Sequence, residues 1–245
     1  MKCPECGKDN ADKQKFCGNC GGALGDARVA DLFESAFKSE ARGDLDAALE
    51  AYGRLLEKRP KSQEILFKMG MVCYELGRVD MAMEKFQQVI EQNPRFVYAH
   101  FRLGLCRYQK CMIEEAISSY SAAVEIASDF VPALLQLGLA QFHIGRLEKA
   151  AETFQKVVKF GRSQTIAHYY LGLVYERMRR ADDAIVQFNL VADENPNDPS
   201  THYHLGMLYK RKFMRDAAIG ELMRANQLDP DDKATLEELS SLQQK

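Results

Sequence analysis

Four cysteines near the N-terminus form two Cys-x-x-Cys pairs, Cys3 with Cys6 and Cys17 with Cys20, and ten residues separate the pairs. Two such pairs place four thiolates tetrahedrally around Zn²⁺ and leave no open coordination position for a substrate. A pair of redox-active dithiols is the alternative, but no βαβ pattern surrounds either pair. The spacing therefore predicts a structural zinc site with Cys3, Cys6, Cys17 and Cys20 as its ligands.

The segment that carries these cysteines is too small to build a hydrophobic core. Metal binding would have to supply its folding free energy, about 10–16 kcal/mol in comparable sites. Its motifs, CPECG and FCGNCG, resemble those of the short bacterial zinc-ribbon family, and the resemblance assigns residues 1–22 to a zinc ribbon. Residues 23–28 are expected to form a short flexible linker.

From residue 29 onward the sequence repeats every 34 residues without a gap. The second unit has an apolar period of 3.6, which predicts two amphipathic helices, Gln63–Glu75 and Asp80–Gln92, with a turn at Gly77. Neither helix alone can bury its apolar face, so each unit needs its neighbours. The predicted units are 29–62, 63–96, 97–130, 131–164, 165–198 and 199–232.

Each unit keeps small and large residues at fixed places. A small residue stands in the middle of the first helix, at Ala36, Gly70, Gly104, Gly138, Gly172 and Gly206. An alanine begins the second helix, and a large residue follows four positions later, at Tyr52, Phe86, Tyr120, Phe154, Phe188 and Leu222. We expect the small residues to let paired helices approach closely and the large residue to fill the gap to the next pair.

These positions resemble the tetratricopeptide repeat, whose pattern is L-G-x-x-Y, then A-x-x-x-F, then P, at a period of 34 residues. The resemblance covers residues 29–232 and implies an all-α, right-handed superhelical solenoid. It also implies that partners bind on the concave face, which the first helices of the repeats line. Residues 233–245 are polar with one leucine stripe, which predicts a C-terminal capping helix.

Two departures from the family pattern are local. The first unit has Ser35-Ala36 in place of the leucine–glycine pair, as an atypical terminal repeat would. Glycine marks the inner turn of three units, but Cys111, Arg179 and Phe213 replace it in the others.

Apolar side chains fill the positions that the resemblance places in the concave groove. These groove candidates are Phe67, Met71, Tyr74, Phe101, Leu105, Tyr108, Leu139, Phe142, Tyr169 and Leu173. They predict a groove for an apolar peptide or an amphipathic helix of a partner protein. The alternative is that these side chains only pack helix against helix.

Positive charge gathers in the last two units, where Arg177, Arg180, Lys210 and Arg211 are candidates for contact with an acidic partner segment or RNA. Their places near helix C-termini offer a simpler explanation, because cations there complement the helix dipole.

Composition argues against several classes of function. The chain has 33 Lys and Arg against 35 Asp and Glu, so no global charge favours nucleic acid or a membrane surface. The apolar runs are too short to span a bilayer. Seven cysteines without a disulfide framework favour a reducing compartment, with the cytoplasm as the default. His100, His168 and His202 share one repeat position and are expected to pack rather than to bind metal.

The sequence thus predicts a non-enzymatic scaffold or adaptor, since no nucleophile–base pair, phosphate-binding loop or carboxylate pair is apparent. Its predicted partners are other proteins, held in the concave groove, and self-association through that groove is left open. The alternative is a nucleic-acid-associated factor that uses the ribbon and the basic edge of the fifth and sixth units.

Overall fold

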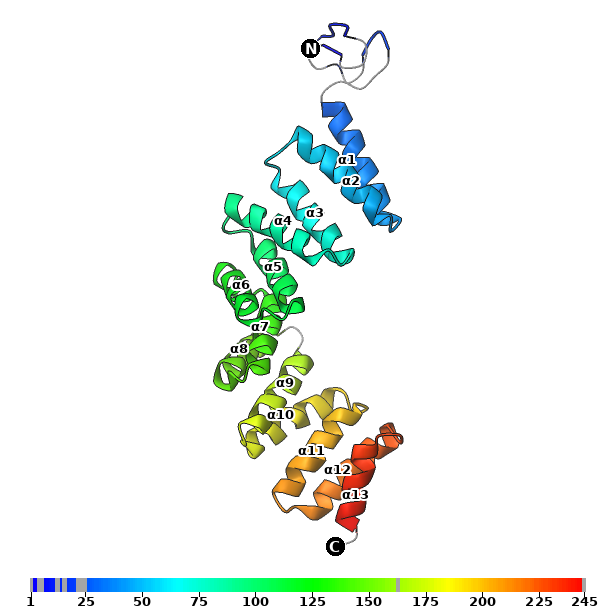
Figure 1. The fold of residues 1–245 in the computed structure, drawn as a ribbon. Helices are drawn as coiled ribbons and strands as arrows, with labels where there is room; N and C mark the ends of the chain where they lie inside the picture. The colour runs from blue at the N-terminus through cyan, green and yellow to red at the C-terminus, as the bar shows by residue number, and fades with distance from the viewer. Residues whose placement is uncertain are drawn as a thin grey trace. The chain divides into compact units, whose positions relative to one another are not determined.

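The structure is a computed structural model that describes residues 2–3, 7–11, 14, 17–20, 26–161 and 164–243. Within these residues the chain forms α-helices and one isolated antiparallel bridge, between Lys2 and Asp9, and no strand (Figure 1). The predicted all-α class is therefore confirmed. The helices are α1 Asp26–Ala41, α2 Leu45–Lys58, α3 Gln63–Glu75, α4 Val79–Gln92, α5 Val97–Gln109, α6 Ile113–Ile126, α7 Val131–His143, α8 Leu147–Lys159, α9 Gln164–Arg177, α10 Ala181–Glu194, α11 Pro199–Arg211, α12 Arg215–Leu228 and α13 Lys233–Gln243.

The helices belong to two compact units, Met1–Met112 and Ile113–Lys245. In the first unit, α1 to α5 pack in succession, each on the next along the chain. In the second unit, α6 to α13 do the same. The division falls between α5 and α6, inside the predicted third repeat. Each unit is thus a run of stacked helix pairs, and the first helices of the pairs are α1, α3 and α5 in one unit and α7, α9 and α11 in the other.

Side chains cap several helix starts. The side chains of Ser62 and Asp198 accept hydrogen bonds from the backbone N–H groups of Ile65 and Thr201. Asp232 likewise accepts from the N–H of Thr235 at 3.1 Å, ahead of the capping helix α13. Such caps satisfy backbone donors that a helix start leaves without a partner. Helix α3 has the predicted bounds, and α4 begins one residue earlier than predicted.

The first helix begins earlier than the sequence indicated. Residues 26–28 were expected in the linker, but α1 already starts at Asp26. The last glycine of the linker is Gly25, and the alanine and arginine that follow Asp26 favour helix, which accounts for the difference. Residues 21–25 lie outside the described part, so the rest of the predicted linker stays a prediction.

The inner turn of every described repeat needs a left-handed residue. Gly43, Gly77 and Gly145 have φ between 72° and 78°, as glycine allows without strain. Cys111, Arg179 and Phe213 hold the same position with φ of 60°. The turn therefore keeps its geometry where glycine is lost, at a conformational cost to the side chains that replace it.

The large residue of each second helix joins two neighbouring pairs. Phe86 is fully buried and shares a core cluster with Leu103 and Cys106 of the next pair. Phe188 likewise packs with Leu205 and Leu208. The predicted gap-filling role is confirmed for these residues, and each also packs against the glycine of its own pair.

Ion pairs repeat along one edge of the helix pairs. Arg78 lies 2.8 Å from Asp46, and Arg146 lies 2.8 Å from Glu114. Lys110 with Asp80 and Lys212 with Asp182 make equivalent contacts. In each case the cation lies near the inner turn of one repeat. Its acidic partner lies at the start of the second helix of the preceding repeat.

Candidate functional site

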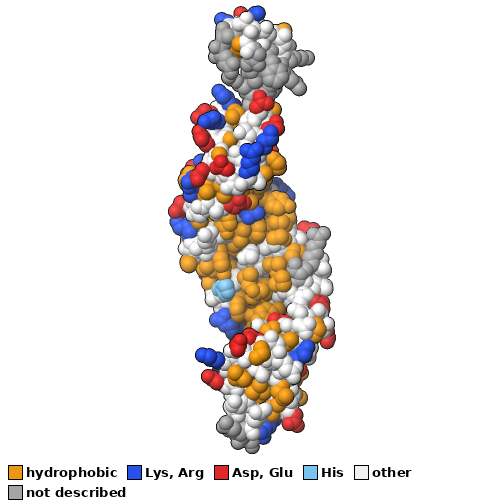
Figure 2. Space-filling view, turned by 90° about the vertical axis from the view of Figure 1, so that its right-hand side faces the viewer, with side chains coloured by type: hydrophobic (Ala, Val, Ile, Leu, Met, Phe, Trp, Pro, Cys, Tyr) orange, Lys and Arg blue, Asp and Glu red, His pale blue; other side chains and the backbone are white. Residues whose placement is uncertain are grey.

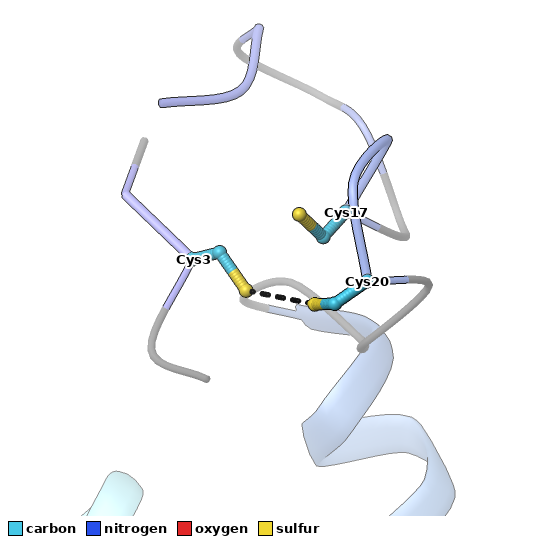
Figure 3. A group of neighbouring side chains, drawn as sticks. All are labelled: Cys3, Cys17 and Cys20. Atoms are coloured by element: carbon cyan, nitrogen blue, oxygen red, sulfur yellow. Dashed lines mark hydrogen bonds between the residues drawn. The ribbon is translucent and has the colours of Figure 1, made fainter. Parts of the chain in front are cut away.

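Three of the predicted zinc ligands meet in the N-terminal segment. The sulfur atoms of Cys3, Cys17 and Cys20 all lie within 4.8 Å of one another, and those of Cys3 and Cys20 face each other (Figure 3). The Sγ atoms of Cys3 and Cys20 are 3.6 Å apart. Tetrahedral thiolates about 2.3 Å from a zinc ion would stand roughly 3.8 Å from each other, so the spacing fits. Cys6, the fourth predicted ligand, lies outside the described residues.

Backbone geometry holds these sulfurs in place. Gly7 has φ of 73°, and its N–H donates to the carbonyl of Cys3 at 2.8 Å, which closes the first knuckle. The N–H of Asn19 points at the Cys17 sulfur from 3.4 Å. Such N–H groups around a metal site stabilise thiolate charge. Gly7 thus turns the backbone after the first cysteine pair.

Asn10 connects the two cysteine pairs, and sequence reasoning did not single it out. Its side-chain carbonyl accepts from the N–H of Gly18 at 3.0 Å, and its amide donates to the carbonyl of Lys8 at 2.7 Å. The only sequence signal is an asparagine in the polar stretch between the pairs, a residue type that often bonds nearby backbone.

The groove candidates of the first unit are half-buried. On α3, Phe67, Met71 and Tyr74 are partly accessible, while their neighbours Leu66 and Val72 are 2% and 1% exposed. The Phe67 ring also contacts the rings of Phe86 and Phe96, at 5.6 and 5.2 Å between centroids. Phe101, Leu105 and Tyr108 of α5 are half-buried in the same way. These side chains thus pack on one side and leave another side open.

Two aromatic side chains on first helices of this unit are more accessible. Phe37 of α1 is 63% exposed, and Tyr98 of α5 is 57% exposed. Figure 2 shows hydrophobic side chains gathered on one face of the helical repeats. Accessible aromatic side chains beside half-buried ones are a feature of surfaces that bind other proteins.

The groove candidates of the second unit are half-buried like those of the first. Leu139, Phe142, Tyr169 and Leu173 pack against a core cluster of this unit. The Phe142 ring is covered by the guanidinium of Arg177, 4.9 Å from its centroid. Phe67, Met71 and Tyr74 of the first unit pack against a core cluster in the same way, so helix packing is one role of the groove candidates in both units.

An ion-pair network ties first helices α9 and α11 together. The carboxylate of Glu176 accepts from Nδ1 of His204 at 2.9 Å and pairs with Arg211 at 3.0 Å. Burial raises the pKa of Glu176, but His204 and Arg211 outweigh it and leave that pKa below its ordinary value. The His204 ring stacks on Phe188, 5.1 Å between centroids. Neither Glu176 nor His204 was singled out from the sequence.

The predicted basic edge divides into engaged and accessible cations. Arg180 pairs with Asp183 at 2.7 Å and lies over the ring of Tyr175. Lys210 pairs with Glu238 of α13. Arg177 bonds the carbonyl of Phe142 and Arg211 pairs with Glu176, yet both side chains are exposed. They line a pocket together with Arg179 and Lys212, which the candidate set had left out.

The repeat-position histidines make hydrogen bonds within the fold. His100 and His202 each contact the carbonyl of the preceding proline, Pro94 and Pro196, at 2.8 and 3.1 Å. His168 bonds Gln187 at 2.8 Å. Cys73 and Cys106 are fully buried, and burial raises the pKa of the Cys106 thiol to about 11. The three histidines thus bond within the fold, and the two cysteines lie in its core.

Comparison with known families agrees with this architecture. Tetratricopeptide repeat models match residues 40–94, 82–132, 113–165, 135–199 and 199–232, and a zinc-ribbon domain model matches residues 2–24. A comparison with curated protein sequences gives no significant match. In the described residues, no helix combines the length and apolar character that a membrane crossing needs.

Solved structures share the fold at low sequence identity. YrrB, described as a TPR protein with an unusual peptide-binding site, is 20% identical, with a TM-score of 0.71, and the match covers 78% of this chain and 98% of YrrB. PilF of Pseudomonas aeruginosa is 18% identical with a TM-score of 0.67, over 89% and 98% of the two chains. MamA is 23% identical with a TM-score of 0.66, over 70% and 94%.

Proposed function

The chain belongs to the tetratricopeptide repeat family, and we propose that it is a non-catalytic scaffold that holds a peptide or helix of another protein against its first helices. Family membership supports a role in protein–protein interaction. The solved relative YrrB is described as having a peptide-binding site, which agrees with the proposal. The proposed surface lies in the first unit, on α3 and α5.

One observation carries this proposal: the apolar groove side chains of the first unit are left half-accessible. Core positions on the same helices, such as Leu103 at 3% exposed, are closed to solvent. Phe101 and Leu105 flank Leu103 on α5 and remain partly open. Burying such side chains under a partner contributes about 25 cal/mol per Å² of apolar area. Aromatic anchors of this kind carry much of the binding free energy in protein interfaces.

The test is a peptide-display selection on the full chain, followed by a groove variant. Phe101→Gln with Leu105→Gln should abolish binding of the selected peptides, because both anchors lose their apolar surface. The matched control is Met81→Gln on the second helix α4, where Met81 is 42% exposed, and it should bind as the parent does. Circular dichroism checks that both variants fold. Unchanged binding by the folded groove variant would refute the proposal.

The N-terminal segment is proposed to bind one structural Zn²⁺ through Cys3, Cys6, Cys17 and Cys20. Three converging sulfurs and the zinc-ribbon match support this assignment. Zinc bound by four thiolates supplies folding free energy rather than catalysis. Cys73, Cys106 and Cys111 of the repeats are free thiols, in keeping with action in a reducing compartment such as the cytoplasm.

The nucleic-acid alternative draws no support from the basic edge. Arg180, Lys210 and Arg211 each pair with a carboxylate of the chain itself. A nucleic acid binds when several cations of the protein neutralise its phosphates and release the counterions condensed on them. Cations already neutralised by the fold contribute little to such binding.

A further inference from the structure

A pocket of about 580 Å³ opens in the second unit, apart from the proposed groove. It lies between the C-terminal ends of α9 and α11 and the turn that leads into α10. Arg177, Arg179, Arg211 and Lys212 line it, with Glu176 as the one acidic lining residue. The pocket is therefore concave and rich in positive charge.

Part of this charge is already neutralised by the fold. Arg211 pairs with Glu176 at 3.0 Å, and Lys212 pairs with Asp182. Arg177 donates to the carbonyl of Phe142 at 3.0 Å and keeps its charge. Four lining cations against Glu176 and Asp182 leave a net charge of two positive units, four minus two. The pocket therefore retains an uncompensated attraction for an anion.

Of the four lining cations, Arg179 makes the fewest polar side-chain contacts with the rest of the chain. Its side chain is exposed, and among the described residues its guanidinium has no hydrogen-bond or ion-pair partner. It stands at the inner turn with φ of 60°, where three other repeats have glycine. An arginine here costs more conformational energy than glycine, and its side chain makes no hydrogen bond or ion pair within the described chain.

Phe213 repeats this departure in the following unit, directly after the lining residue Lys212. It has φ of 60° and is 95% exposed. Met214 beside it is 46% exposed. The positive φ of Phe213 and the exposure of its ring do not stabilise the fold. A cation without a side-chain partner thus lines the pocket on one turn, and on the next turn an exposed aromatic ring directly follows the lining residue Lys212.

We propose that this pocket binds an acidic peptide segment of a partner protein, whose carboxylate enters among Arg179, Arg211 and Lys212 while a neighbouring apolar side chain packs on Phe213. Guanidinium groups bind carboxylates through paired hydrogen bonds, which suits Arg179. An exposed aromatic ring suits a peptide better than a phosphate backbone, which would need a longer track of free cations.

The test uses the full chain and a fluorescein-labelled peptide of glutamates around a central Leu-Phe step, measured by anisotropy at low salt. Arg179→Gly and Phe213→Gly should each weaken binding, the former by about tenfold, as expected for a lost charged hydrogen bond. Both should raise the melting temperature, because glycine removes the strain of a positive φ. Weaker binding by a more stable protein cannot come from misfolding.

Cys111→Gly is the matched control. Cys111 occupies the same turn position with φ of 60° in the other unit, so its replacement should raise the melting temperature and leave binding unchanged. A second probe carries glutamine in place of every glutamate and should bind at least about tenfold more weakly.

Three results would overturn the proposal. One is no binding of the acidic peptide by the parent chain, and another is equal binding by parent and Arg179→Gly. The third is tighter binding of a labelled single-stranded RNA that displaces the peptide, which would assign the pocket to phosphate. Failure here leaves the groove proposal intact, because that proposal concerns α3 and α5 of the other unit.

Discussion

A Cβ atom placed on Gly70 would lie 2.6 Å from the ring of Phe86, which is fully buried. Gly138 and Phe154 show the same relationship at 2.8 Å, and Gly172 with Phe188 at 2.7 Å. These glycines lie inside helices, so backbone freedom does not explain them. They are glycines because the aromatic ring of the second helix occupies the space of a side chain.

Gly70→Ala should therefore destabilise the first unit. Alanine normally favours a helix over glycine by about 0.5–1 kcal/mol. Here the added methyl must displace a buried ring, and overpacking of this kind costs roughly 1–3 kcal/mol. We expect a lower urea midpoint, measured by circular dichroism.

Gly53→Ala is the control for that change. Gly53 also lies within a helix of the first unit, α2, but an added Cβ would meet nothing within 4 Å. Its replacement should raise the urea midpoint. If Gly70→Ala also raised the urea midpoint, the close contact with Phe86 would not explain why this position is a glycine.

Glu176→Gln should lower stability at neutral pH, because His204 and Arg211 would lose their carboxylate. Hydrogen bonds to charged groups contribute about 1.5–3 kcal/mol each, and Glu176 is well buried, so a loss of about 2 kcal/mol is expected. The folded pKa of Glu176 lies below its ordinary value of 4.5. The stabilisation is therefore complete above that value and disappears as the pH falls through the folded pKa.

Urea titrations of the parent and Glu176→Gln at several pH values test this dependence. The two midpoints should differ most above pH 5 and converge in acid, at a pH below the ordinary glutamate pKa of 4.5. A difference that persists unchanged in acid would mean that glutamine disturbs packing rather than charge.

The repeats were predictable because their pattern is local and periodic. A glycine or alanine in the first helix and an aromatic residue sixteen positions later, as at Gly70 and Phe86, are visible without a structure. The helix caps at Ser62 and Asp198 follow from residue type alone. Each such feature depends on side chains within one repeat or its neighbour.

The charged network and the pocket were not predictable in the same way. Glu176 and His204 are 28 residues apart, and nothing in the pattern pairs them. Position alone made Arg180 a candidate for partner contact, yet Asp183 and Tyr175 engage it. Which cations stay free depends on side-chain geometry that sequence periodicity does not specify.

The ion pairs between repeats should contribute little. Arg146 and Glu114 have side chains 42% and 60% exposed, so solvent screens their attraction. A double-mutant cycle with Arg146→Ala and Glu114→Ala should give a coupling of about 0.2–1 kcal/mol. Raising the salt concentration should reduce it further. A larger coupling that resists salt would show that the pair organises the repeat interface.

Metal analysis of the purified chain should find one zinc ion per molecule, since Cys3, Cys17 and Cys20 already converge. Cys3→Ser should remove most of the zinc, because each ligand is a thiolate that serine cannot replace. Cys111→Ser is the control, since Cys111 is an exposed free thiol of the repeats.

The helical circular dichroism signal should stay almost unchanged in Cys3→Ser, because the described residues before Asp26 contribute no helix. Acid should release the metal from the parent chain, as protons compete for the thiolates. Full zinc content in Cys3→Ser would contradict the assignment, and a large loss of helix would show that the ribbon supports the folding of the repeats.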